Sequence, residues 1–290
     1  MFPGPVYLAS DAHLGATAPA RDQAFRHWLR HAADVAGTVV INGDLFDFWF
    51  EYGSVVPRGH TRTLGLLAEI ADNGTPVVVM GGNHDWWGGS FLENEVGVTF
   101  LREPTILDLA GWKTLLAHGD GIGQGDLGYR MLSAVIRSRP ARWAFRWLHP
   151  DIGAWIARGV SLTEARPEDP TPAESARSRT LSQWAEATLR NDPGLDLVTM
   201  GHTHVPEMRR VEPGSARRKP GFYVNSGDWV HHTTYVVLLE DADTPRMEEW
   251  PLPSTPQGLA KGGDDHALPT RGSTAQGEPE SDVDPDGPAG

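Results

Sequence analysis

The sequence predicts an α/β fold, and three observations support that class. Short apolar runs rich in β-branched residues recur along the chain, beginning with residues 6–9 and 38–41. In the first half of the chain, the intervals between successive runs are long enough for a helix. Such alternation of strands and helices favours parallel strands. The length of 290 residues suits one large domain that carries an insertion better than two independent domains.

The expected elements follow one another along the chain. Strands are predicted at residues 6–9, 38–41, 76–80, 113–116, 195–198, 221–225 and 233–239, and helices at residues 18–33, 61–72, 129–148 and 173–189. The helical pattern of residues 129–148 is broken at Pro140, and residues 167–172 mark a loop. Because the last two strands are close together in the sequence, we expect them to be antiparallel neighbours.

The first five strands each end in residues that can bind a metal ion. The strand tips are Asp11-Ala12-His13, Gly43-Asp44, Gly82-Asn83-His84-Asp85, His118-Gly119-Asp120 and Gly201-His202-Thr203-His204. Any one of these tips alone could be a plain turn, since Asp, Asn and Gly are common turn residues. Neighbouring strands of one sheet would bring all five tips together at one edge. The ordered set therefore predicts a single pocket built from distant parts of the chain.

The residue types in these tips favour a pair of divalent metal ions. Carboxylates, imidazoles and one amide, without a thiolate, form a donor set that suits Mn²⁺ first, with Fe²⁺ or Zn²⁺ as alternatives. The chain has no cysteine, which excludes disulfides and iron–sulfur clusters held by thiolates. Two ions about 3.5–4 Å apart can clamp a phosphoryl group for in-line attack. Asp44, alone at the second tip, is the natural bridging carboxylate.

In this order the tips resemble the motifs of the calcineurin-like metallophosphoesterase superfamily, over roughly residues 6–240. The resemblance implies two mixed β-sheets packed as a sandwich with flanking helices. It implies one metal ion held by Asp11, His13, Asp44 and His204, and a second held by Asp44, Asn83, His118 and His202. His84 would then bind no metal, and Asp85 would orient it as the general acid or as a cation that stabilises the phosphorane.

Two local sequences narrow the resemblance to the UDP-2,3-diacylglucosamine hydrolase family. They are residues 43–50, GDLFDFWF, and residues 223–229, YVNSGDW. The resemblance implies a pyrophosphatase of lipid A synthesis that releases UMP and 2,3-diacylglucosamine 1-phosphate, and a helical cap that lines an acyl-chain groove. The best-known branch of that family carries arginine where His84 stands, so the substrate stays open. Asp47 is expected to orient an imidazole of the site.

Two alternatives to this function are carried forward. One is a phosphodiesterase or phosphatase that acts on a soluble phosphate ester. The other is a scaffold protein that keeps the metallophosphoesterase fold without activity. A scaffold is expected to lose metal ligands, whereas this chain keeps each of them and His84 as well.

The chain is expected to divide into a metallophosphoesterase domain and a tail. The domain spans residues 1–253 and includes a helical insert at residues 121–193. Residues 254–290 are rich in Gly, Pro, Ser, Asp and Glu and almost free of apolar residues, which predicts a disordered acidic tail.

Charge and apolar patterning set the expected partners and location. The net charge of −13 argues against nucleic acid as a partner, and nothing in the sequence implies a protein partner. No secretion signal and no run of eighteen apolar residues is found, so a cytoplasmic protein is expected. The insert concentrates arginines and aromatic residues, namely Arg130, Arg137, Arg139, Arg142, Arg146, Trp143, Phe145 and Trp147. This pattern predicts peripheral binding to the inner face of the membrane, with a lipid-linked phosphate substrate.

Three other patterns carry less weight. Residues 123–128 match a dinucleotide-binding fingerprint literally, but no acidic residue stands near the required distance of about 20 residues. His27 and His31 are one helical turn apart and are expected to lie on an exposed helix face. His231 and His232 are expected in a loop near the rim of the site, without a ligand role.

Overall fold

The structure is a computed structural model that describes residues 1–123, 131, 134–160, 163, 166–212 and 219–252. Residues Met1–Pro253 form one compact unit. The predicted tail of residues 254–290 and most of the fingerprint of residues 123–128 lie outside the described residues, as does Arg130.

One sheet contains the first three predicted strands. Its order is β11-β10-β1-β2-β3-β4, with β1 parallel to β2, β2 to β3 and β3 to β4, as the strand–helix alternation predicted. The strands are β1 (Val6–Ala9), β2 (Thr38–Asn42), β3 (Val77–Met80), β4 (Thr99–Leu101), β10 (Thr234–Leu238) and β11 (Arg246–Glu249). Because β10 runs antiparallel to β1, the sheet is mixed.

The second sheet has the order β5-β6-β7-β9-β8 and is also mixed. Its strands are β5 (Thr105–Leu109), β6 (Trp112–Leu116), β7 (Leu197–Met200), β8 (Glu207–Val211) and β9 (Gly221–Asn225). Strands β6, β7 and β9 are parallel to one another, whereas β5 and β8 are antiparallel edges.

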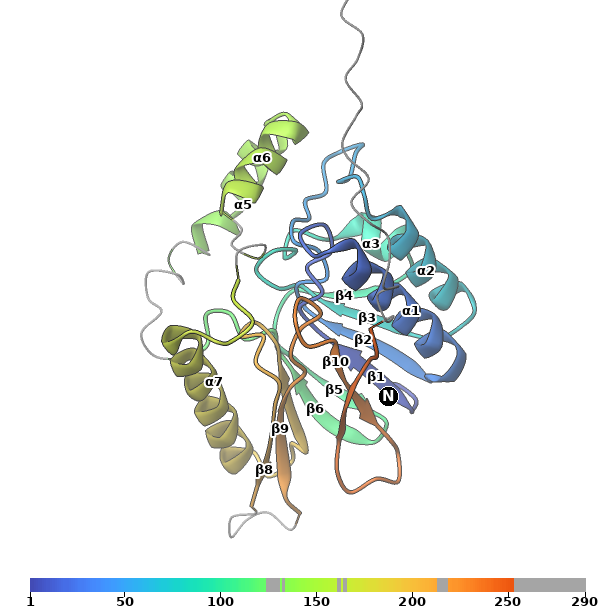
Figure 1. Ribbon diagram of the computed structural model, residues 1–290, viewed down its shortest axis with the longest axis vertical. Coiled ribbons are helices and arrows are strands. Elements are labelled where there is room, and N and C mark those ends of the chain that lie inside the picture. The colour runs from blue at the N-terminus through green and yellow to red at the C-terminus, as the bar shows by residue number, and fades with distance from the viewer. Residues whose placement is uncertain (124–130, 132–133, 161–162, 164–165, 213–218, 253–290) are drawn as a thin grey trace, which may run out of the picture. The chain divides into compact units, whose positions relative to one another are not determined.

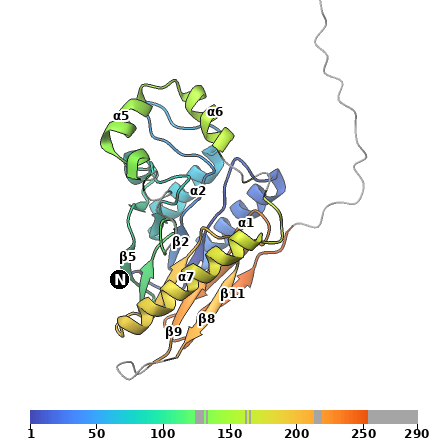
Figure 2. The same cartoon turned by 90° about the vertical axis from the view of Figure 1, so that its left-hand side faces the viewer.

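Helices cover the outer faces of the two sheets (Figure 1). Helices α1 (Pro19–Val35), α2 (Thr61–Asp72) and α3 (Ser90–Asn94) lie on the side of the first sheet. Helix α7 (Pro172–Asn191) lies along the second sheet beside β8 and β9 (Figure 2). The predicted α/β fold, with two mixed sheets as a sandwich and flanking helices, is confirmed.

The apolar core follows the alternation of side chains along the central strands. In β2, Val40 points between the two sheets, where it belongs to a cluster with Leu116 and Leu197 of the second sheet. Its neighbours Val39 and Ile41 belong instead to the cluster under α1 and α2. Successive side chains of a strand point to opposite faces, so a strand buried on both sides is apolar throughout. This burial fixes the strand tips that carry the polar residues.

Two sequence-based expectations about the strands are wrong. The five tips do not come from one sheet, because β1, β2 and β3 belong to the first sheet and β6 and β7 to the second. Strands β9 and β10 are not neighbours, because β9 pairs with β7 and β8 while β10 pairs with β1 and β11. The short connection between β9 and β10 crosses from one sheet to the other, which proximity in sequence cannot distinguish from a hairpin.

The interval between β6 and β7 contains α5 (Arg139–Arg146), α6 (Pro150–Val160) and α7. The predicted break at Pro140 marks the start of α5, where Pro140 occupies the first turn and the Ser138 side chain caps the helix. Phe145 of α5 packs against Phe50 and Trp87, with ring centroids 4.6 and 5.0 Å away. Helix α5 thus contacts loops that follow β2 and β3.

Candidate metal centre

Five predicted metal ligands have left-handed backbone conformations. The φ angles are 52° at Asp11, 43° at His13, 51° at Asp44, 68° at His202 and 62° at His204. Such angles are uncommon for residues other than glycine and persist only where the surrounding structure enforces them. The sharp turns after β1, β2 and β7 point side chains from both sheets toward one place.

The glycines in these turns make room for ligands from other strands. A Cβ at Gly43 would overlap the ring of His118, and a Cβ at Gly201 would overlap the carboxylate of Asp11. Each glycine precedes a ligand in sequence and lies against a different ligand in space. Close approach of the tips therefore requires glycine at both positions.

Asp11, His13 and His204 form one compact donor group that is almost fully buried. The Nε2 atoms of His13 and His204 lie 3.1 Å apart, and His204 Nε2 is 3.3 Å from Asp11 Oδ1. The opposite ring nitrogens face carboxylates, since His13 Nδ1 is 3.3 Å from Asp47 and His204 Nδ1 is 2.8 Å from Asp228. These carboxylates favour protons on Nδ1, which turns both Nε2 lone pairs inward.

This arrangement fits a metal ion. Two inward lone pairs 3.1 Å apart repel each other unless a cation lies between them, either a proton or a metal ion. Buried ionised carboxylates are also costly without a compensating positive charge. The donor set of imidazole and carboxylate is the one expected for Mn²⁺, Fe²⁺ or Zn²⁺.

A second donor group is formed by Asp44, His118 and His202. His118 Nε2 lies 3.1 Å from Asp44 Oδ2, and His118 Nδ1 lies 2.9 Å from the carbonyl oxygen of Asn42. The amide oxygen of Asn83 is 2.9 Å from His202 Nδ1, so Asn83 joins the same group. The four residues predicted for the second ion thus lie together.

Asp44 lies between the two groups. Its Oδ2 atom is 3.1 Å from His118 Nε2 and 3.7 Å from His13 Nε2. Its Oδ1 atom accepts a hydrogen bond of 2.9 Å from the backbone N–H of His84. This is the position expected of a carboxylate that bridges two ions.

The charges within the cluster shift the pKa values of its members. Burial would raise the pKa of Asp44, but His118 and His84 hold it well below its usual value. Burial would lower the pKa of His118, but Asp44 raises it well above the usual value. Burial and the charge of His118 lower the pKa of His202. The shift favours the protonated form of His118, and a metal ion that binds His118 Nε2 has to compete with that proton.

His84 lies at the rim of the cluster, with its ring centroid 4.7 Å from that of His13. Its Nδ1 atom is 2.7 Å from the carbonyl oxygen of Asp47. Asp85 was predicted to orient the His84 ring. Its carboxylate instead accepts the backbone N–H groups of Gly82 and Leu45, each at 2.7 Å. Asp85 thus joins the loops after β2 and β3, and Asp47 orients His84.

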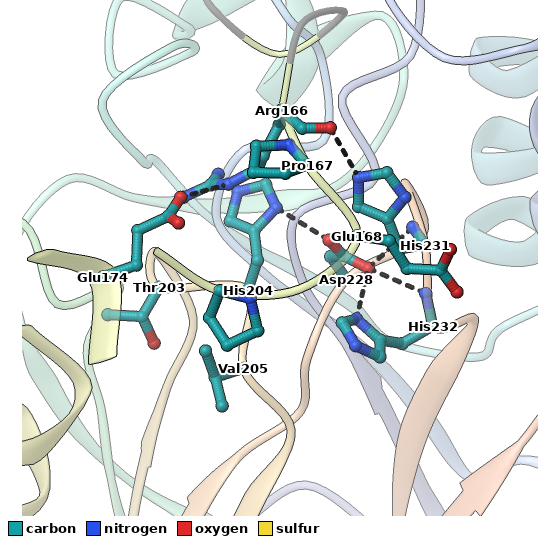
Figure 3. Close-up of a pocket in the computed structure, with 11 residues that line it drawn as sticks. Arg166, Pro167, Glu168, Glu174, Thr203, His204, Val205, Asp228, His231 and His232 are labelled. Atoms are coloured by element: carbon teal, nitrogen blue, oxygen red, sulfur yellow. Dashed lines mark hydrogen bonds and ion pairs between the residues drawn. The ribbon is translucent and has the colours of Figure 1, made fainter. Parts of the chain in front are cut away.

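Asp228 is a functional residue that the sequence analysis missed. Its Oδ2 atom accepts from His204 Nδ1, and its Oδ1 atom accepts the backbone N–H groups of His231 and His232 at 2.9 and 3.0 Å (Figure 3). Burial would raise the pKa of the Asp228 carboxyl, but hydrogen bonds from the His204 and His232 side chains and from the His231 backbone hold it far below its usual value. Its place in the NSGDW sequence, directly after a strand, is the signal that could have revealed it.

A hollow opens on the His204 flank of the cluster (Figure 3). It is lined by His204, Thr203, Val205, Arg166, Pro167, Glu168, Pro170, Glu174, Asp228, His231 and His232. The Arg166 guanidinium is paired with Glu174 at 2.7 Å. The predicted rim position of His231 and His232 agrees with this lining.

Three other polar residues considered in the sequence, Asp120, His27 and His31, lie outside the cluster. Asp120 pairs with Arg137 at 2.6 Å. His27 is exposed on α1, and the His31 ring packs against Tyr7 and Trp250 with centroids 5.8 and 5.3 Å away. Neither histidine belongs to a group of potential metal ligands among the described residues.

Comparison with known proteins identifies the family. A family model described as calcineurin-like phosphoesterase matches residues 4–206. The chain belongs to the calcineurin-like phosphoesterase family. This phosphoesterase is therefore a metal-dependent hydrolase, as predicted, and the family implies divalent metal ions, for which the two donor groups are suited.

Two relatives of this phosphoesterase carry the name UDP-2,3-diacylglucosamine hydrolase. The protein from Porphyromonas gingivalis is 29% identical over 249 residues, which cover 80% of this chain and 93% of the relative. The protein from Ralstonia nicotianae is 32% identical over 223 residues, which cover 74% of this chain and 82% of the relative. The family model and these relatives confirm both predicted resemblances, the one from the strand tips and the narrower one from residues 43–50 and 223–229.

The solved structure of Yfce, a phosphoesterase from E. coli, is more distant. It is 16% identical, the match covers 86% of this chain and 100% of the Yfce chain, and the TM-score is 0.36.

A helix that spans a membrane has to meet requirements of both length and hydropathy. None of the helices of the described residues meets both requirements.

Proposed function

We propose that this phosphoesterase hydrolyses the pyrophosphate of UDP-2,3-diacylglucosamine to UMP and 2,3-diacylglucosamine 1-phosphate, in lipid A synthesis. The observation that carries the proposal is the similarity, over most of the chain, to relatives named for that substrate. The convergence of seven predicted ligands and His84 supports an active hydrolase over a scaffold.

Two divalent ions, Mn²⁺ first with Fe²⁺ or Zn²⁺ as alternatives, fit the site. Asp11, His13, Asp44 and His204 would hold one ion, and Asp44, Asn83, His118 and His202 the other. When bound, the pair generates a nucleophile from water at neutral pH and neutralises charge on the phosphoryl oxygens.

His84 is proposed as the group that meets the leaving oxygen. The Asp47 carbonyl oxygen holds its Nδ1 atom, which leaves Nε2 to face the substrate. The side chain is 21% exposed, so it can reach a bound phosphate while the ring stays oriented. In this position His84 donates a proton to the leaving oxygen or stabilises the phosphorane as a cation.

The insert is proposed as the surface that meets an anionic membrane. Trp143 of α5, Trp147 directly after α5 and Trp155 of α6 are 66%, 77% and 70% exposed. Arg139 and Arg146, the first and last residues of α5, are exposed as well. Indole rings suit the headgroup region, and arginines are attracted to anionic lipids. The protein would then work in the cytoplasm, peripherally on the inner face of the inner membrane, with access to a lipid-linked substrate.

The alternative is a phosphodiesterase or phosphatase on a soluble substrate, which the histidine at position 84 keeps open. The two functions differ in their specificity constants. The test compares kcat/KM of the Mn²⁺-loaded protein for UDP-2,3-diacylglucosamine and for a generic aryl phosphodiester. We expect preference for the first, with UMP and the acylated sugar 1-phosphate as products. Preference for the aryl diester would favour the alternative.

A further inference from the structure

The stretch between α6 and α7 of the insert places the Thr163 hydroxyl beside the metal centre. Thr163, between α6 and α7, is only 5% exposed. Its Oγ1 atom donates to Asp47 Oδ1 at 2.7 Å and lies 3.4 Å from His13 Nδ1. The Asp47 carboxylate that faces His13 is therefore itself held by the insert.

A second contact from the same segment reaches the other side of this donor group. The carbonyl oxygen of Arg166 accepts from His231 Nε2 at 3.2 Å (Figure 3). The backbone N–H of His231 donates to Asp228, whose other oxygen accepts from His204 Nδ1. Arg166 is anchored in turn by its ion pair with Glu174, in the first turn of α7.

The two contacts converge on the histidines of one donor group. Through Asp47 the segment acts on His13, and through His231 and Asp228 it acts on His204. In the other group, His118 is held from within the first sheet, since its Nδ1 atom bonds the Asn42 carbonyl oxygen in β2. The contacts of Thr163 and Arg166 described above thus both lead to the Asp11–His13–His204 group.

We propose that Thr163 and Arg166, which lie between α6 and α7, position the imidazoles of the Asp11–His13–His204 site and thereby set its affinity for a metal ion. Thr163 is a positioning residue for His13, because it acts through Asp47. Groups that orient metal-ligating histidines commonly contribute 10–100-fold in metal affinity. The proposal rests on the proposed metal site but not on the identity of the substrate.

The test measures Mn²⁺ binding to metal-depleted protein by equilibrium dialysis. Thr163→Val keeps the shape of the side chain and removes the hydroxyl, so we expect one of the two ions to bind about tenfold more weakly and the other to bind normally. Thr163→Ser retains the hydroxyl and should restore the weakened affinity. His231→Phe removes the second contact without touching Asp47, and it should weaken the binding of the same ion.

The matched control is Thr188→Val, the same substitution on α7 away from the metal centre. The Thr188 Oγ1 atom donates to the Trp184 carbonyl oxygen within the helix, so this variant should bind both ions as the parent protein does. Normal binding of both ions by Thr163→Val and His231→Phe would overturn the proposal, and so would equal weakening of both ions. Selective weakening supports it even if the wild-type protein leaves UDP-2,3-diacylglucosamine intact, which would overturn only the proposed substrate.

Discussion

Asp44 holds the position on which both donor groups depend. Because its Oδ2 atom faces His118 and His13, Asp44→Ala should abolish activity and lower metal content at both sites. Metal analysis of the purified variant, next to its hydrolysis rate, checks this prediction. Loss of only one ion would show that Asp44 does not bridge.

His84 should behave differently from Asp44. His84→Ala should retain both metal ions and lose rate by about 10²–10⁴-fold, the usual effect of removing a positioned proton donor. The measurement is again metal content together with kcat. A fall in metal content as large as that of Asp44→Ala would show that His84 is itself a ligand.

Sequence was informative for residues that stand at strand tips and less so for residues that act through a neighbour. Asp11, Asp44 and His204 were found because an apolar strand precedes each polar tip, and burial of that strand fixes where the tip points. Asp228 and Thr163 were missed because their roles depend on contacts between segments distant in sequence. The partner of His84 was assigned to the adjacent Asp85, whereas the fold brings Asp47 to it.

At the scale of elements, the helical insert carries the prediction about membranes. Replacing Arg139, Arg142 and Arg146 with Gln should weaken binding to anionic vesicles, since each arginine near an anionic surface contributes about 1 kcal/mol. Turnover of a diacylated substrate should slow, while hydrolysis of a small soluble phosphodiester should be nearly unchanged. Vesicle co-sedimentation and the two rates are the measurements.

The matched control removes three arginine charges from a surface outside the insert. Arg30, Arg58 and Arg62 are exposed residues on α1, before α2 and on α2. Their replacement with Gln should leave vesicle binding close to that of the parent protein. Equal loss in both triple variants would reduce the effect to net charge, and a parent protein that binds no vesicles would remove the membrane role.

Some strands were predicted from the sequence, whereas others were not. Strands buried on both faces, such as β2 and β3, were found because their apolar residues are continuous. Edge strands such as β8 were not found, because their alternation of buried and exposed residues is short. The partners of β9 and β10 could not be read from the sequence, since the chain between them passes from one sheet to the other.

At the scale of the whole molecule, pH should change both the stability of the metal-free protein and the stabilisation that metal binding adds. The raised pKa of His118 stabilises the metal-free protein below the ordinary histidine pKa, and this stabilisation is lost as pH rises through the raised value. The lowered pKa of Asp44 stabilises the protein above the ordinary aspartate pKa, and this is lost as pH falls. Metal ions compete with the His118 proton, so the rise in Tm on adding Mn²⁺ should grow with pH.

Thermal unfolding of metal-depleted and Mn²⁺-loaded protein across pH checks this expectation. Activity should likewise fall on the acid side, and excess Mn²⁺ should move that limb to lower pH. An acid limb that does not respond to metal concentration would assign the titration to another group.

The central claim is that two ions in one buried cluster make this chain a hydrolase. Its most direct test is titration of the metal-depleted protein with Mn²⁺ while hydrolysis of UDP-2,3-diacylglucosamine is followed. We expect no turnover without metal and a rate that reaches its plateau at two ions per chain. Turnover in the presence of a chelator, or a plateau at one ion, would contradict it.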